Sequence, residues 1–146
     1  LHDALPIYWN VSNGKNFSFI FSENLLSDIK PLEKWDVSNA TDLGGLFNEC
    51  KNLSDITPLE NWNVSKCENL SRIFLYCKKL SDITPTQNWN VSNVKDLNYS
   101  FGSCEKISNI TPLKNWNISK CKNLCNHIFY MTIFFLYLQT ETKTRK

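Results

Sequence analysis

Tryptophan recurs along this chain at a nearly constant interval, and that interval limits the folds open to it. The spacings between successive tryptophans are 26, 27, 27 and 27 residues, and the chain has no tryptophan outside this series. One unit of this length cannot bury its own apolar positions, so repeated units must stack and bury them against one another. The tryptophans are Trp9, Trp35, Trp62, Trp89 and Trp116.

The apolar spacing inside a unit predicts its local structure. Leu43, Leu46, Phe47 and Cys50 lie at positions i, i+3, i+4 and i+7, which is typical of one face of a short helix. The Trp-x-Val step alternates apolar and polar residues, as a strand does. Which segment carries the main parallel strand stays open. We therefore predict an α/β repeat solenoid of about 4.5 units, each a short strand plus a short helix or turn.

The two ends of the chain depart from the repeat, which we expect to occupy residues 8–124. Residues 1–7 read as the translation of a sequencing adapter, so we predict that they are not native. Residues 125–146 are interpreted as a divergent cap, a frameshifted end or an interfacial anchor. Their apolar run, 128–138, has 11 residues. A span needs about 20, so we expect no transmembrane segment.

Further columns recur at the repeat interval, and we predict a structural role for them. Stacked side chains of one column point in parallel, so we expect buried thiols rather than disulfides in the cysteine column. The tryptophan column is likewise predicted to be core rather than a stacking platform for sugars or bases. The aromatic column is Phe21, Phe47, Phe74 and Phe101, and the cysteine column is Cys50, Cys77 and Cys104.

The residue types exclude most catalytic chemistry. Histidine occurs only at positions 2 and 127, and no C-x-x-C pair is present. The acidic column of Asp28, Asp55 and Asp82 continues as Asn109, which favours a turn over a cation site. A net charge of +2 is too small to indicate nucleic acid. We expect no catalytic, cofactor-binding or metal-binding residue, no cofactor and no enzymatic activity.

One unit supports a resemblance to a known family. Residues 89–112 read W-N-V-S-N-V-K-D-L-N-Y-S-F-G-S-C-E-K-I-S-N-I-T-P, which resembles the BspA-like leucine-rich-repeat surface proteins. The likeness covers roughly residues 8–124, with Leu and Ile where that family is rich in Met. The resemblance implies a leucine-rich-repeat-like stack, a cell-surface or secreted location, and adhesion or binding of a host protein. It implies no catalytic residue.

These observations predict a non-catalytic repeat binding module in a larger adhesin-like protein. We expect its partner to be a protein, with host surface and matrix proteins as candidates. The binding surface should use exposed positions that vary between the fixed columns. An intracellular protein-interaction scaffold is the alternative, favoured by unpaired cysteines. The candidate binding residues are Glu33, Glu60, Gln87 and Lys114.

Overall fold

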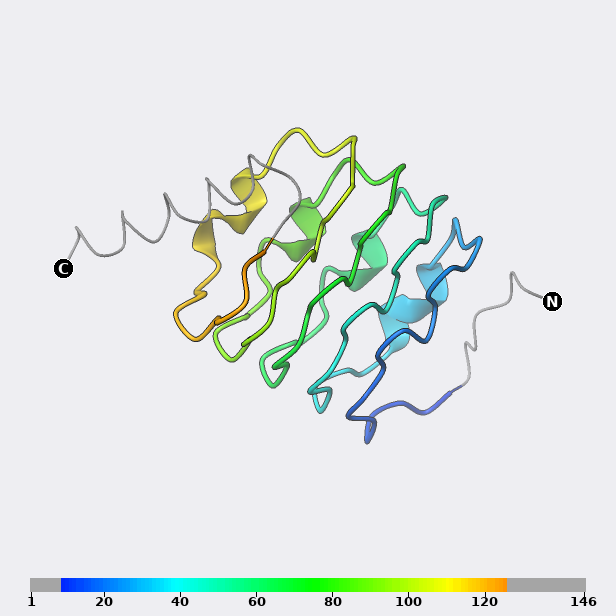
Figure 1. Cartoon of the computed structure of the whole chain (residues 1–146). Helices are drawn as coiled ribbons and strands as arrows, with labels where there is room; N and C mark the ends of the chain where they lie inside the picture. Colours follow the sequence, from blue (N-terminus) through cyan, green and yellow to red (C-terminus); the bar gives the residue numbers. More distant parts are fainter. Residues whose placement is uncertain (1–8, 126–146) are drawn as a thin grey trace, which may run out of the picture.

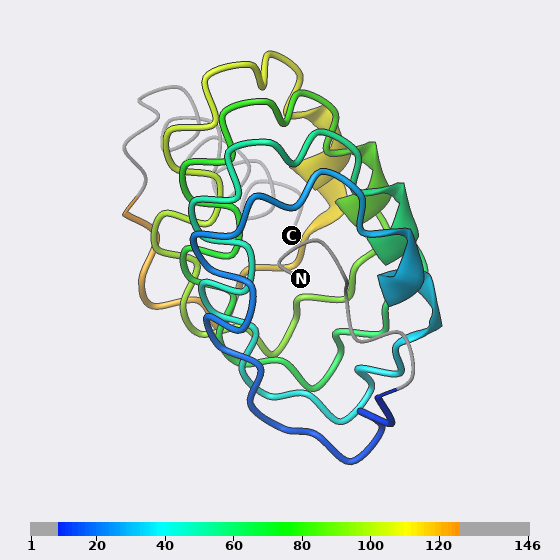
Figure 2. The same cartoon turned by 90° about the vertical axis from the view of Figure 1, so that its right-hand side faces the viewer.

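The computed structural model describes residues 9–125, which wind into coils stacked along one axis (Figure 1). Seen along that axis, the coils overlap in one oval outline (Figure 2). The predicted non-native segment, residues 1–7, lies outside the described residues, as does all of the predicted tail except Cys125. The repeat interval thus sets the circumference of one coil.

Four short 3-10 helices form one edge of the stack in the described part of the chain. Each has proline in its first turn, where a fixed φ and a missing N–H are tolerated. They lie side by side, one per coil, and each contacts the next (Figures 1 and 2). The helices are η1 (Lys30–Lys34), η2 (Thr57–Leu59), η3 (Thr84–Thr86) and η4 (Thr111–Asn115).

The predicted α/β repeat solenoid is wrong. Residues 9–125 contain no α-helix and no β-strand; apart from the 3-10 helices they are turns and irregular chain. Neighbouring coils meet in isolated parallel bridges, one per coil, instead of a sheet. These bridges join Asn16 to Asp42, Asp42 to Asn69, Asn69 to Asp96, and Asp96 to Asn123.

Backbone hydrogen bonding explains why the helix-like spacing does not give a helix. In residues 42–50, every second N–H group donates to a carbonyl of the next coil. The N–H of Gly45, for example, donates to the carbonyl of Ser71 at 2.7 Å. The N–H groups between them close tight turns, as that of Asn48 does to the carbonyl of Gly45 at 2.9 Å. An α-helix would need these N–H groups for its i−4 carbonyls. We call the equivalent segments turn ladders; they are residues 16–24, 42–50, 69–77 and 96–104.

The fourth and eighth residues of every turn ladder have a positive φ, which also prevents a helix. Only one of these eight positions is a glycine, Gly45, at 62°. The other seven carry side chains in a region that costs L-residues roughly 1–2 kcal/mol each. They are Phe19, Glu23, Glu49, Arg72, Tyr76, Tyr99 and Ser103.

Three corners of each coil are shaped by an Asn or Asp side chain. Its Oδ1 accepts the N–H of the residue two positions on, at 2.8 Å for Asp55, 3.1 Å for Asn63 and 2.9 Å for Asn69. Such Asx turns mimic a backbone turn and satisfy a backbone donor at the bend. The acidic column that includes Asp55 is therefore a turn element, as the substitution by Asn109 indicated.

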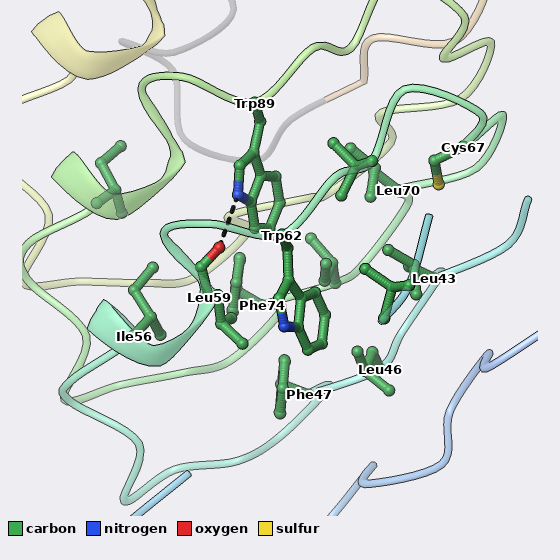
Figure 3. Packing of buried hydrophobic residues seen from close by; sticks show 14 of the residues in the cluster. Leu43, Leu46, Phe47, Ile56, Leu59, Trp62, Cys67, Leu70, Phe74 and Trp89 are labelled. Carbon is green, nitrogen blue, oxygen red and sulfur yellow. Dashed lines mark hydrogen bonds between the residues drawn. The ribbon is translucent and has the colours of Figure 1, made fainter. Parts of the chain in front are cut away.

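The core is a set of parallel side-chain columns inside the coils (Figure 3). Phe47 and Phe74 stack with ring centroids 5.7 Å apart, and Phe74 and Phe101 with centroids 5.5 Å apart. Leu43 and Leu46 also have no exposed surface. The i, i+3, i+4, i+7 spacing thus identified the inward-facing residues correctly, although the backbone that turns them inward is a turn ladder.

The first coil is one residue shorter than the others, and the missing residue falls at a single corner. Asn24 and its equivalent Cys50 are 26 residues apart, whereas Leu26 and Leu53 are 27 apart. The turn ladders on either side stay in register, because the bridge from Asn16 to Asp42 follows the same pattern as the later ones. Coil length can therefore change just after a turn ladder without disturbing it.

Replacing Glu49 by glycine tests the turn-ladder conformation. Its φ of 60° is unfavourable for a side-chain residue, so Glu49→Gly should raise the free energy of unfolding by about 0.5–1 kcal/mol. The matched control is Glu60→Gly at a φ of −55°, which should lower it by about the same amount. Urea unfolding measures both, and effects of the same sign would contradict the conformation.

Candidate binding surface

The tryptophan column lies in the core and joins the coils. Trp62, Trp89 and Trp116 are 4–6% exposed, and each indole Nε1 donates to a backbone carbonyl 30 residues earlier, at 2.9–3.1 Å. Figure 3 shows one such bond, from Trp89 to the carbonyl of Leu59. Trp35 is also buried, but Trp9 is 60% exposed. The buried indoles present no face on which a sugar or base could stack.

The cysteine column is buried and forms no disulfide. Cys50, Cys77 and Cys104 have at most 1% exposed surface, and each thiol donates to the carbonyl of a phenylalanine in the preceding coil, at 3.0–3.2 Å. Burial raises the pKa of the Cys50 thiol to about 11 and that of Cys104 to about 12. These thiols are poor nucleophiles and poor metal ligands, because both roles need the thiolate.

The remaining cysteines lie outside this column. Cys67 is buried, and burial raises its thiol pKa to about 12. Cys121, in the same column two coils on, is half-buried, and Cys125 is exposed. All six cysteines of the chain are free thiols.

The four candidate binding residues lie in one row along the edge formed by the 3-10 helices. Glu33 and Lys114 belong to η1 and η4, whereas Glu60 and Gln87 directly follow η2 and η3. All four are exposed. We call these four residues the η row. Its charge changes along the stack, from two carboxylates through a neutral amide to an ammonium group.

The structure adds a hollow that sequence reasoning did not find. It measures about 260 Å³ and lies between η1 and η2, with Glu33, Glu60, Lys30 and Asp55 among its lining residues. Lys30 and Glu33 form an exposed ion pair at 3.1 Å. The hydroxyl and N–H of Thr57 hold the pKa of Asp55 below its usual value, so this carboxylate stays ionised. The sequence signal for this hollow is the acidic column that includes Asp55, and the sequence analysis interpreted that column as a turn.

A second exposed group lies on the turn ladders and was also missed. The guanidinium of Arg72 sits over the ring of Tyr99, 5.8 Å from its centroid, and Tyr76 in the same ladder as Arg72 is 39% exposed. Arg72, Tyr76 and Tyr99 all have positive φ, which turns their side chains away from the core. Glycine is the residue that would have predicted a positive φ from the sequence, and only one of the eight positive-φ positions in the turn ladders is a glycine.

No cluster of three or more His, Cys, Asp or Glu side chains in residues 9–125 has a geometry that could hold a metal ion. None of the helices in that range has the length and apolar character required to cross a membrane.

Stacked coils with a repeated interior and an exposed row that varies define a repeat protein. The chain matches the family described as "Mycoplasma protein of unknown function, DUF285" over two overlapping segments, residues 6–84 and 54–139. Together they cover most of the chain, which belongs to this family. No curated protein matches the chain.

The buried thiols should make stability depend on alkaline pH. Burial raises the pKa of the Cys67 thiol from 9.0 to about 12. The contribution of this thiol to the free energy of unfolding is therefore complete below pH 9.0 and is lost as the pH rises from 9.0 to about 12. Cys67→Val should keep the packing, because Val94 occupies the same column. We expect the variant to lose less stability than the parent above pH 9.0. Urea unfolding across this range measures the two slopes, and equal slopes would contradict the burial of this thiol.

Proposed function

We propose that this chain is a non-catalytic repeat module that binds a protein partner, within a cell-surface or secreted protein of adhesin type. The η row supports this proposal most directly: its residues change from coil to coil while the columns beneath them stay apolar. The DUF285 family is related to the BspA-like surface repeat proteins, and the resemblance to those proteins implies adhesion or host binding.

The charge order of the η row suggests how a partner would lie. Glu33 and Glu60 flank the hollow near one end, and Lys114 lies near the other. A host surface or matrix protein with basic and acidic groups in the matching order would be attracted and aligned by this row. Exposed charges act mainly on the rate of association and on its dependence on salt.

The η row can be tested by reversing its acidic end. We expect the double variant Glu33→Lys and Glu60→Lys to weaken binding to immobilised host matrix proteins, chiefly by slowing association, as measured by surface plasmon resonance. The matched control is Glu23→Lys with Glu105→Lys, which makes the same charge change at exposed positions outside the row. No binding by the parent chain, or equal losses in the two double variants, would contradict the proposal.

An intracellular protein-interaction scaffold is the second candidate. Six free thiols favour it, because reducing compartments keep cysteines unpaired. Brief protease treatment of intact producing cells separates the two candidates. Loss of the chain from intact cells supports surface exposure, whereas protection until the cells are lysed supports the scaffold.

A further inference from the structure

The third turn ladder carries an excess of positive charge. Residues 69–79, the ladder and the two residues after it, hold three cations and no carboxylate, which gives a net charge of +3. The equivalent segments of the coils on either side, residues 42–52 and 96–106, each hold two carboxylates and one cation, a net charge of −1. Figure 2 shows the turn ladders on the side of the oval opposite the 3-10 helices, so this charge lies away from the η row. The three cations are Arg72, Lys78 and Lys79, and all are exposed.

Arg72 is held in place while its charge stays unneutralised. Its guanidinium lies over the ring of Tyr99 in the next coil, and within residues 9–125 it takes part in no ion pair. Glu49 and Glu105 of the neighbouring coils pair with lysines instead, at 3.5 Å and 3.3 Å. A guanidinium stacked on a ring keeps the N–H groups along its edge, which can bind one carboxylate with two hydrogen bonds.

The backbone here favours glycine, yet it carries large side chains. The φ angle is 55° at Arg72, 61° at Tyr76 and 57° at Tyr99. Glycine adopts such angles at no steric cost, whereas a side chain in this region is unfavourable. Tyr76 is 39% exposed, so burial of its ring offsets little of that cost. Costly backbone conformations persist most often at binding and active sites, and these side chains point to a role other than stability.

We propose that Arg72, Tyr76, Lys78 and Lys79 form a binding surface for a short acidic segment of a partner protein. We call these four residues the Arg72 patch. The Arg72 guanidinium binds a carboxylate of the segment, the ring of Tyr76 packs against its carbon chain, and the two lysines attract it. Arginine and tyrosine are also the residue types that carry much of the binding energy at protein interfaces. The inference stands whether or not the η row binds a partner.

The flanking coils limit the kind of anion that fits. A nucleic acid, a sulfated polysaccharide or an anionic membrane would extend over the coils on both sides, where it would meet the carboxylates of Glu49 and Glu105. Like charges brought together across an interface are unfavourable. A short acidic segment places its carboxylates over the third coil alone. Its recognition depends on side chains, because the turn-ladder N–H groups already donate to turns and to the next coil.

Selection of short linear peptides from a display library, with the whole parent chain as target, tests the proposal. We expect acidic peptides among those selected, and we expect a synthetic copy of one to bind the parent in isothermal titration calorimetry. Arg72→Gly should weaken that binding by about tenfold or more, because hydrogen bonds to a charged group are lost. A selection that yields no acidic peptide, or equal affinity for the parent and Arg72→Gly, would overturn the proposal.

Glycine at position 72 separates binding from folding. Relief of the positive φ offsets the lost contact with Tyr99, so the melting temperature of Arg72→Gly should be no lower than that of the parent. Ser103→Gly is the matched control, because it relieves the same φ of 55° in the fourth ladder without touching the Arg72 patch. Lys66→Ala removes an exposed positive charge outside the turn ladders. Both controls should keep the affinity of the parent, and a loss in either as large as that of Arg72→Gly means that the proposal fails.

Other occupants of the Arg72 patch give different results. If oligothymidylate or a heparin oligosaccharide bound the parent more tightly than the acidic peptide and lost affinity in Arg72→Gly, the patch would be a polyanion site and the proposal would be wrong. Self-association in sedimentation velocity that Arg72→Gly abolishes would assign the patch to a second copy and would equally overturn it. We expect neither result, because the chain's own carboxylates at Glu33, Glu49, Glu68 and Glu105 already pair with lysines.

Discussion

This structure depends on one constraint: the backbone N–H groups of a coil donate partly to carbonyls of its own turns and partly to carbonyls of the next coil. In a helix or a sheet, one partner type serves every N–H of the element. In the turn ladders, every second N–H group donates to the next coil and the N–H groups between them close turns within their own coil. The hydrogen bonds of a coil are therefore complete only when the next coil is present to accept them. This explains why the unit is stable as a stack, and why positive φ is tolerated at two positions per ladder.

Side chains at fixed positions complete the same arrangement. Indole and thiol groups donate to carbonyls of the preceding coil, and Asn or Asp side chains close the corners. Most of these polar groups thus hold the coils together. The residues left to vary are those outside the columns, of which the η row is the most regular. The binding role proposed above would use these variable residues, which the repeated interior holds in a regular row.

The sequence predicted the stacking interval, the buried columns and the turn role of Asp55, because burial and Asx turns follow from residue type and spacing. It did not predict the turn ladder. Leu43, Leu46, Phe47 and Cys50 have helical spacing, but that spacing reports only which residues face inward. The deciding interactions, such as the N–H of Gly45 with Ser71, join residues of different coils and have no local signature. The hollow beside Glu33 and Glu60 was missed for the same reason, since two coils form it together.

The shorter first coil shows where such a chain can be edited. The residue that it lacks lies beyond the end of its turn ladder, and the bridges on both sides keep their register. The number of residues at this corner can therefore change while the geometry of the turn ladders stays the same. Insertions there would project from the side of the stack as loops, each carried by an undisturbed coil. A lineage of such proteins could gain new recognition segments at that corner while the shared interior stayed the same.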